Sequence, residues 1–589
     1  MRSIVSLMLL VPAFAFAVSM QPMTALPRDG NVPTSSPQAG PGPTHEARFT
    51  IGIVDTVGGT TYDWCANGPA LRMLVRTPGS GVHSLWMFSA ATTGSDFPDR
   101  NMRYNFYDYS TNAWNWLDTD FMVSGINTFS TRTGYGKIDL DTNGIPVISA
   151  HHVTGATTAD IAPIFARDAD VGAGIFQYVY GESVGLNRNE WPYIAVNTNG
   201  TQQLAMIDAN NSDNLFWSRS TAWGTWETPV SVPSPQPEPG FPTQNIATSK
   251  VPGSNKVCIT WVTTPASGYA QDPGFYRESQ DAGVTWDDPV DLGFPPAFSQ
   301  DPESLASFHL TSLFPLYDKH DRLHIVGNVS PYVRDTNWIL PGEIWHWCAS
   351  NPNTWDLVHI ASPDSLNAAV GYNTMICARP SLGEDGSGNL FVAWEEFDGV
   401  NVEQTTSRVR ADIWYSYSID NGVSWVDGTK ITDGGEVSYR FPSILNPIGD
   451  TVMVEYMLDQ QAGFYIQGEG SATNNPIVVQ KWENPVPPGV EGPKVAPPAR
   501  MDVTTGPNPF GRSTRLSYAV PYRGKVSLDI FDAVGRNVRT LVDGRSEPGR
   551  FSAVWDGRSQ SGALVPGGVY LYRYALDDKR MTGKLTLTR

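Results

Sequence analysis

The chain has 589 residues, more than one hydrophobic core usually organises, so two or more domains are expected. Its formal net charge of −19, from 40 basic and 59 acidic residues, opposes a general affinity for nucleic acid or for anionic membranes. The sequence contains 55 glycines, 46 prolines and 19 tryptophans, and it has no long apolar pattern of helical period. This composition predicts an all-β protein with many turns and short aromatic strands.

The N-terminus has the features of a signal peptide, which we assign to residues 1–19. Arg2 gives the positive start, Ile4 to Phe16 form a short apolar core, and Ala15-Phe16-Ala17 is a small-x-small cleavage site. The apolar run is too short to cross a membrane, and no other stretch of about twenty apolar residues occurs. We therefore expect a secreted, extracellular protein without a transmembrane segment, soluble or attached to the outer cell surface.

Two stretches rich in proline and glycine divide the rest of the chain. Residues 20–46 are expected to form a flexible leader, and residues 484–499 (NPVPPGVEGPKVAPPA) a linker. Between them lies a body of residues 47–483, and after them a tail of residues 500–589. Each of these two parts has a length that a folded unit can occupy.

The body contains two segments of the form S-x-D-x-G-x-x-W, each between strand-like runs. Their defining residues are Ser279, Asp281, Gly283 and Trp286 in the first, and Ser418, Asp420, Gly422 and Trp425 in the second. Asp is suited to binding backbone amides in a turn, Gly to a positive φ, and Trp to filling the gap between strands. The segments resemble the Asp-box, or BNR repeat, of sialidase-like β-propellers, a hairpin turn between the outer strands of a blade.

Weaker copies extend the repeat. Cys348, Ser350 and Trp355, for example, keep the spacing of the box with altered chemistry. The two-strand openings that precede the boxes number seven and lie near Leu71, Ile138, Ile194, Ile246, Leu313, Leu382 and Ile444. We expect a seven-bladed β-propeller, with six blades, as in sialidases, as the alternative. Residues 47–57 are a spare strand available to close the ring, and the last unit (residues 440–483) has four plausible strands but no box.

The tail contains several motifs in a fixed order. They are Pro507-Asn508-Pro509-Phe510, the runs TRLSYAV and KVSLDIFDAVGRNVRTL, Val554-Trp555-Asp556-Gly557, and Gly567-Gly568-Val569-Tyr570. This order resembles the immunoglobulin-like domain related to the flagellar hook-cap protein, which is similar to the C-terminal sorting domains of type IX secretion cargo. The resemblance implies a small β-sandwich whose partner is the export machinery. Alternation predicts that Val526-Leu528-Ile530 and Val569-Leu571 form the buried faces of their strands.

The resemblance to sialidases implies three arginines that bind the substrate carboxylate, a Tyr nucleophile assisted by Glu, and an acid/base Asp. Arg379, in A-R-P-S-L, lies where the family's first arginine is expected, and Arg440, in Y-R-F-P-S, lies at the equivalent position of the next unit. Both are candidate ligand-binding residues, because a guanidinium can hold a carboxylate in a bidentate manner. Tyr439 is expected to face the opposite side of its strand from Arg440. Glu395-Glu396 is interpreted as solvated surface.

No catalytic residue is assigned, because neither a third arginine nor a Tyr–Glu pair stands out. The sequence favours a non-enzymatic propeller that binds a glycan or a surface protein through its central face. The alternative is a sialidase-like exo-glycoside hydrolase. A propeller fold by itself supports neither over the other.

Neither a metal nor another cofactor is expected. The segment Asp139 to Gly144 imitates the start of a calcium loop, but its twelfth position is Ala150 rather than Glu, so a hairpin turn explains it better. The four cysteines, at positions 65, 258, 348 and 377, form no C-x-x-C pair and do not resemble a zinc site. Buried free thiols and a disulfide both stay open, but a bridge between the first and the last of them is not expected in a seven-bladed ring.

Overall fold

The structure is a computed structural model. It describes residues 47–588 apart from 67–71, 94–96, 154–160, 182–188, 209–213, 234–242, 264–271, 296–303, 309–312, 334–335, 353, 373, 487–499, 507, 512–513 and 547–548. The predicted signal peptide, the predicted leader and residues 487–499 of the predicted linker lie outside the described residues.

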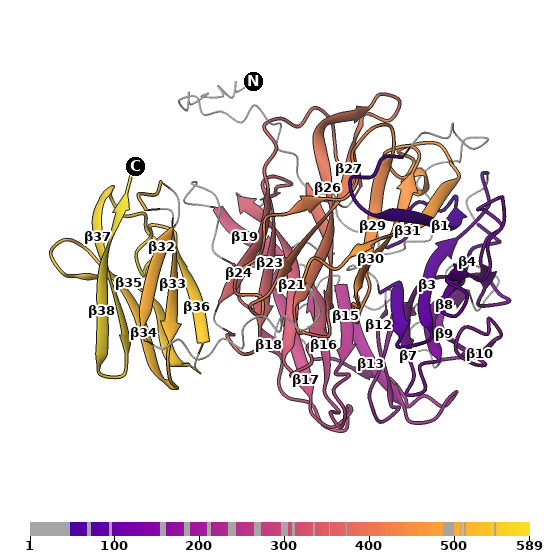
Figure 1. Ribbon diagram of the computed structural model, residues 1–589, viewed down its shortest axis with the longest axis horizontal. Helices are drawn as coiled ribbons and strands as arrows, with labels where there is room; N and C mark the ends of the chain where they lie inside the picture. Colours follow the sequence, from indigo (N-terminus) through magenta and orange to yellow (C-terminus); the bar gives the residue numbers. More distant parts are fainter. Residues whose placement is uncertain are drawn as a thin grey trace, which may run out of the picture.

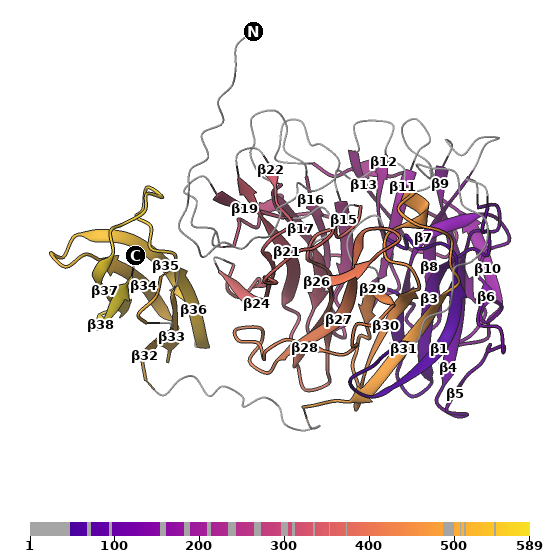
Figure 2. The same ribbon diagram turned by 90° about the horizontal axis from the view of Figure 1, so that it is seen from above.

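The described residues form β-strands joined by turns and loops (Figures 1 and 2). The strands of the body are β1 (Ile53–Thr60), β2 (Leu74–Thr77), β3 (Gly81–Phe88), β4 (Asn101–Asp108), β5 (Ala113–Trp114), β6 (Ile126–Asn127), β7 (Thr133–Leu140), β8 (Pro146–Val153), β9 (Ile161–Asp168), β10 (Phe176–Tyr180), β11 (Asn189–Val196), β12 (Gln202–Asp208), β13 (Asn214–Ser220), β14 (Val230–Ser231), β15 (Thr243–Thr248), β16 (Val257–Val262), β17 (Gly274–Ser279), β18 (Val290–Asp291), β19 (Ser304–Phe308), β20 (Phe314–Tyr317), β21 (Leu323–Val333), β22 (Thr336–Asn337), β23 (Gly342–Cys348), β24 (Trp355–Ala361), β25 (Cys377–Glu384), β26 (Leu390–Glu403), β27 (Arg408–Ser418), β28 (Thr429–Lys430), β29 (Ser438–Ile444), β30 (Thr451–Asp459) and β31 (Asn475–Glu483).

Among the described residues, these strands form seven antiparallel sheets of four to six strands. Each sheet packs against the next one along the chain, as expected for the blades of a propeller. The number of sheets agrees with the favoured count of seven blades, which stays a prediction. The single helical element of the described part is the 3-10 helix η1 (Tyr465–Gln467), so no helix there is long and apolar enough to cross a membrane.

The first and last parts of the body meet in one sheet. Strand β1 pairs with β31, so that the order is β1-β31-β30-β29 and the N-terminal strand lies at the outer edge. The Ser84 hydroxyl on β3 then donates a hydrogen bond to Glu455 on β30, at 2.6 Å. The last unit therefore supplies three strands of its own sheet, so the prediction of four was wrong: between β30 and β31 the described chain contains the 3-10 helix η1 and no further strand.

Both predicted boxes lie in the turns that join the third and fourth strands of a sheet, β17 to β18 and β27 to β28. In the first turn, the backbone N–H of Gly283 donates to the Ser279 hydroxyl at 2.9 Å, and that of Thr285 donates to Asp281 at 2.8 Å. The second turn repeats both bonds. Gly283 has a φ of +81°, and Trp286 packs edge-on against Trp217 of the preceding sheet, with ring centroids 5.1 Å apart.

The tail is a separate sandwich with its own core, built from two sheets of order β32-β33-β36 and β35-β34-β37-β38. Its strands are β32 (Asp502–Gly506), β33 (Thr514–Val520), β34 (Gly524–Phe531), β35 (Asn537–Ser546), β36 (Gly549–Trp555), β37 (Gly568–Leu576) and β38 (Lys579–Leu587).

One of the two buried faces expected in the tail is confirmed. Val526, Leu528 and Ile530 are buried, whereas Val569 and Leu571 are 44% and 41% exposed. The prediction for β37 was wrong because its tyrosines take the core side. Tyr570, for example, packs against Trp555 at 4.8 Å between ring centroids, and an aromatic ring buries more apolar surface than a valine does.

Candidate functional site

Four strands at the edges of their sheets contain the same β-bulge. In β7, β11, β25 and β29 the pairing register shifts by one residue near the start of the strand. One residue of each bulge has a positive φ: Tyr135 (54°), Trp191 (50°), Arg379 (53°) and Phe441 (60°). Left-handed backbone at a residue other than glycine costs about 1–3 kcal/mol and is concentrated at functional sites, while a bulge re-aims the side chain that it carries.

The bulges correct the alignment of the two candidate arginines. Arg379 is equivalent to Phe441, and Arg440 is equivalent to Ala378, because the same Pro-Ser pair follows each bulge and resumes the pairing. The expectation that the arginines occupy equivalent positions was therefore wrong by one residue. They nevertheless lie close together, since they contact one carboxylate.

That carboxylate belongs to Glu395 on β26. An oxygen of Glu395 accepts a hydrogen bond from Nη1 of Arg379, and the other lies 3.2 Å from Nε of Arg440. The backbone N–H of Phe441 also donates to it, at 2.9 Å. Glu395 is fully buried, so its interpretation as solvated surface was wrong. Burial alone would raise its pKa, but the two guanidinium groups and the Phe441 N–H lower the pKa below its usual range.

Arg440 is enclosed by its contacts. Its guanidinium carbon lies 4.6 Å from the ring centroid of Phe464 and 4.9 Å from that of Phe397, and the residue is 1% exposed. Tyr439 lies on the other side of the strand, where its hydroxyl donates to the backbone carbonyl of Arg48 at 3.0 Å. The two neighbours therefore face opposite ways, as predicted.

Arg379 is buried but incompletely bonded. Its Nη1 donates to Glu395 and to the Thr374 hydroxyl, at 3.2 Å from the latter. Both Nε and Nη2 are buried, and among the described residues no acceptor lies within hydrogen-bonding distance of either. Each such donor costs about 1–3 kcal/mol when it stays unsatisfied. Arg379 therefore has two buried N–H groups that no described residue satisfies.

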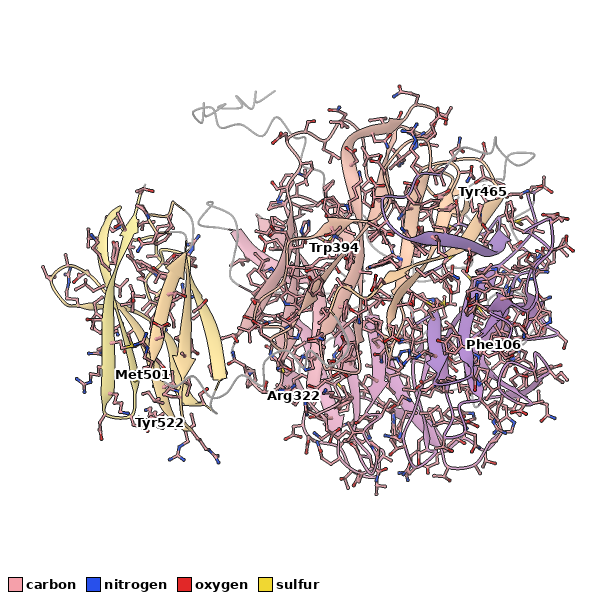
Figure 3. The ribbon with its side chains drawn as sticks, viewed as in Figure 1. Phe106, Arg322, Trp394, Tyr465, Met501 and Tyr522 are labelled. Carbon is pink, nitrogen blue, oxygen red and sulfur yellow. The ribbon has the colours of Figure 1, made fainter. Side chains whose placement is uncertain are left out.

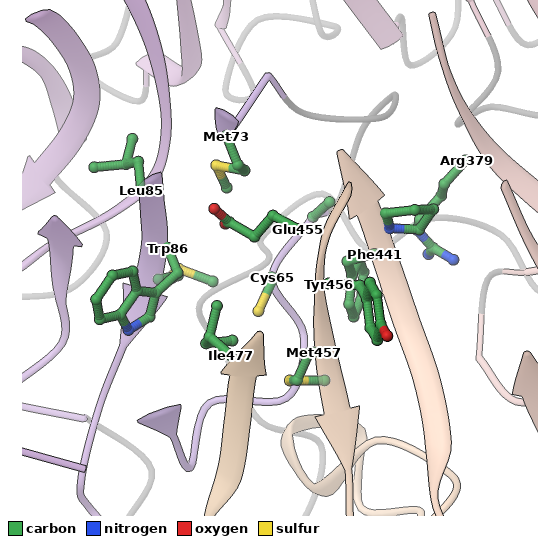
Figure 4. A pocket seen from close by; sticks show the side chains of 13 residues that line it. Cys65, Met73, Leu85, Trp86, Arg379, Phe441, Glu455, Tyr456, Met457 and Ile477 are labelled. Carbon is green, nitrogen blue, oxygen red and sulfur yellow. The ribbon is translucent and has the colours of Figure 1, made fainter. Parts of the chain in front are cut away.

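Arg379 also lines a small cavity (Figure 4). The cavity has a volume of about 20 Å³, so it holds one water molecule or a group of similar size and not a sugar ring. Its wall is largely apolar, with the Cys65 thiol and the Glu455 carboxyl as further polar groups. Burial raises the pKa of Glu455 well above its usual range, and the Ser84 hydroxyl opposes this rise.

A pair of buried aspartates lies next to Arg440. Asp63 accepts backbone N–H groups of Tyr465 and Ile466, the latter at 3.3 Å. Burial raises the pKa of Asp63 to about 7, against the opposing effects of these amides and of Arg440. Burial and then the charge of Asp63 raise the pKa of Asp459 well above its usual range. A buried acid that titrates near neutrality beside an arginine is a candidate for proton transfer.

A second polar cluster adjoins the first and was not found in the sequence. Nη1 of Arg100 lies 3.3 Å from the Tyr62 hydroxyl, which is 2.9 Å from the hydroxyl of Tyr135. Nη2 of Arg100 lies 3.4 Å from Nε2 of His151. The ring of Phe97 links the clusters, since it contacts Tyr62 at 5.0 Å and Tyr465 at 5.9 Å between centroids.

The remaining sequence candidates have structural roles in the described residues. Asp139 lies 2.8 Å from Nζ of Lys250, and Asp141 lies 2.6 Å from Arg167, at the turn between β7 and β8. These ion pairs fit the hairpin interpretation of that segment. All four cysteines are buried free thiols.

Comparison with known proteins identifies the tail more clearly than the body. Residues 518–578 match the model of the FlgD Ig-like domain family. No curated protein sequence matches the chain.

Three solved structures illustrate what the fold is similar to. An ulvan lyase has a TM-score of 0.46 at 12% identity, with 73% of this chain and 94% of that chain covered. A Hadza microbial sialidase has a TM-score of 0.34 at 12% identity, with 65% and 73% covered. An α-L-arabinanase from Penicillium chrysogenum has a TM-score of 0.30 at 15% identity, with 51% and 94% covered. The seven successive sheets of the body and the family match of the tail describe an all-β protein of propeller type followed by an Ig-like domain.

Proposed function

We propose that this protein is an exported propeller that binds a glycan carrying a carboxylate group at the inner ends of β25 and β29. The observation that carries the proposal is Arg379, a buried cation whose Nε and Nη2 meet no acceptor among the described residues. A guanidinium offers these two N–H groups side by side, in the geometry that a carboxylate accepts. A ligand carboxylate would satisfy both once the side chains around the cavity of about 20 Å³ move apart to admit it.

The charges around Arg379 favour an anion. Arg379 and Arg440 share the negative charge of Glu395. Burial raises the pKa of both acids beside Arg440, Asp63 and Asp459, which disfavours their charged forms. Burial disfavours the charged form of the neighbouring Glu455, whose pKa is raised well above its usual range. In a chain with a net charge of −19, such a local cation is selective for an acidic group that fits it.

Two features support a saccharide as the carrier of that acidic group. The two box segments resemble those of sialidase-like propellers, whose ligands are glycans. The half-buried ring of Phe441 lies 4.7 Å from the guanidinium carbon of Arg379 and gives the site an aromatic wall. Ligand sites typically combine such apolar surfaces with a few well-placed polar groups.

The second candidate function is glycoside hydrolysis, and the pKa of Asp63 is the observation that favours it. An acid with a pKa of about 7 can donate a proton to a leaving group near neutral pH. The Tyr–Glu part of a sialidase site is not supported, because Glu395 is held between two arginines and Tyr439 faces away from them. We therefore expect no turnover of fluorogenic sialosides between pH 4 and 8. Turnover that is lost in Asp63→Asn would establish the enzyme instead.

The ligand class is tested by exposing the full chain to an array of neutral and acidic glycans. Binding confined to glycans with uronic or sialic acids supports the proposal. Binding to neutral glycans alone contradicts it, because a neutral glycan has no carboxylate to accept the Arg379 N–H groups.

Export is the remaining part of the proposal. It rests on the signal-peptide features of residues 1–19 and on the resemblance of the tail to sorting domains of type IX secretion cargo. The Ig-like domain would then serve release or attachment at the cell surface, while the propeller carries the ligand.

A further inference from the structure

A second group of titratable side chains lies between β20, β21 and β23, outside the Arg379 site. His324 on β21 lies directly opposite Cys348 on β23 in the strand pairing, and Asp318 follows β20. His324, His346, Asp318 and Cys348 are buried, with exposures of 0%, 0%, 2% and 6%. Figure 3 shows Arg322, which pairs with Asp318, well apart from Tyr465 of the Arg379 region.

The hydrogen bonds determine the protons of both histidines. Nδ1 of His346 lies 3.2 Å from the carbonyl oxygen of Gly422, which can only accept, so Nδ1 carries a proton. Nε2 of the neutral His346 then accepts from Nδ1 of His324, at 2.8 Å. Burial and the charge of His324 hold the pKa of His346 well below its usual range, which agrees with a neutral ring.

The other nitrogen of His324 also carries a proton. Its Nε2 lies 3.2 Å from the carboxylate of Asp318 and 3.8 Å from Sγ of Cys348. A nitrogen lone pair facing a carboxylate would be repelled, so Nε2 donates. His324 is therefore an imidazolium ion in a buried position.

The charges around this ion leave one negative charge to be supplied. Asp318 serves two cations, since Nε of Arg322 donates to the same oxygen at 2.7 Å. Glu384 on β25 also faces the cluster, but burial raises its pKa to about 7, and it accepts the backbone N–H of Lys319 at 2.8 Å. The remaining ionisable group near the Nε2–H of His324 is the Cys348 thiol. As a thiolate it would supply the second negative charge opposite the charges of His324 and Arg322.

Polar groups at Cys348 suit a thiolate. The Ser350 hydroxyl lies 3.0 Å from Sγ, and Nδ2 of Asn421, in the second box turn, donates to it at 4.0 Å. Burial alone would raise the pKa of this thiol, yet His324 and Ser350 lower it to about 7. Burial raises the pKa of each of the other three cysteines instead.

We propose that Cys348 is a preformed thiolate and the covalent modification site of this chain, and that it takes small disulfides. The sulfur of Cys348 attacks one sulfur of the reagent, and a new S–S bond forms as the old one breaks. The departing thiolate carries away the electron pair, so Cys348 is oxidised to a mixed disulfide and half of the reagent is reduced. With Cys348 only 6% exposed, the reagent must be small.

The test treats the full native chain with a small disulfide, methyl 2-pyridyl disulfide, and follows the released 2-thiopyridone. We expect one fast equivalent per chain, mapped to Cys348 by peptide mass spectrometry, with a rate that levels off just above pH 7. Cys348→Ser removes the fast phase, and the buried control Cys258→Ser keeps it. His324→Gln slows it by roughly tenfold at pH 6.5, because the thiolate fraction falls when the pKa returns toward about 8.5.

Wild-type labelling decides the proposal even if His324→Gln fails to fold. Labelling of another cysteine first would overturn it. A rate that keeps rising through pH 9, as for an ordinary thiol, or no reaction before denaturant is added, would overturn it as well.

Discussion

Arg379 and Phe441 occupy the same bulge position in two neighbouring sheets, and the guanidinium of one lies 4.7 Å from the ring centroid of the other. Both residues have a positive φ, which L side chains rarely adopt. The backbone strain at both positions directs a cation and an aromatic ring to the same place. Glu395 and Arg440 then hold this arrangement from behind, through buried ion pairs.

Glu395 is expected to be the main support of the site. Glu395→Gln removes the only negative charge that contacts both arginines, and breaking a buried pair in this way typically costs about 3–5 kcal/mol. We expect a loss of that size in the free energy of unfolding, measured in denaturant by tryptophan fluorescence. Its neighbour Glu396 is the control, because it contacts a half-buried histidine and lies partly in solvent. Equal losses for Glu395→Gln and Glu396→Gln would show that the buried ion pairs of Glu395 with the two arginines do not stabilise the fold more than a partly exposed pair does.

The first box turn is expected to depend on Gly283 for two reasons. A Cβ there would lie 2.3 Å from the ring of Trp217, and the backbone has a φ of +81°. Gly253, in the same sheet, has a φ of +83° but no atom within 4 Å of such a Cβ. Gly253→Ala should therefore report the backbone cost alone, about 1 kcal/mol, and Gly283→Ala should lose roughly 1–3 kcal/mol more through overpacking. Similar unfolding midpoints for both variants would refute the contact with Trp217.

The buried Asp63 predicts a loss of stability as the pH rises. Its pKa is higher in the fold, about 7, than in the unfolded chain, where it is near 3.8. The stabilisation from its protonated form is therefore complete below about pH 4 and is lost as the pH rises through about 7. Asp63→Asn should gain stability relative to the wild type between pH 5 and 8, by roughly 2.5 kcal/mol. A constant difference between the two proteins across this range would contradict the raised pKa.

Much of the fold could be predicted from local patterns, whereas the site depends on distant contacts. The box turns and the seven strand openings follow from short motifs whose bonds close within a few residues. Asp63, by contrast, accepts an N–H from a residue 402 positions away, and nothing near it in the sequence indicates this. The Pro-Ser pair that follows both bulges aligns Arg379 with Phe441, whereas matching the two arginines by residue type placed them one residue out of register.

Glu395 could have been placed correctly from its strand. It shares a face with Phe391 and Ala393 by the two-residue alternation, and both are fully buried. Two adjacent acidic residues usually lie on the solvated surface, and this general tendency led to the wrong assignment although the alternation places Glu395 on a buried face. In β37 of the tail the alternation was recognised, but the wrong face was assigned to the core, because tyrosines rather than aliphatic residues fill it.

Deletion of residues 500–589 should separate folding from export. The core of the tail contains only tail residues, so the propeller should keep its unfolding transition. If the tail is a sorting domain, the truncated protein should no longer be released or displayed by a host with type IX secretion. Cell fractionation and immunoblotting measure this directly. Undiminished release of the truncated chain would reduce the tail to a structural domain.

The most direct test of the binding site is calorimetric titration of the full chain with an acidic oligosaccharide that binds on the array. The same oligosaccharide with its carboxyl groups reduced to alcohols is the matched ligand. We expect the wild type to prefer the acidic form by at least tenfold, about 1.4 kcal/mol, and Arg379→Gln to lose that preference. Arg277→Gln, a change in the sheet of the first box, should keep it. Equal affinity of the wild type for both ligands, or an unchanged preference in a folded Arg379→Gln variant, would contradict the account.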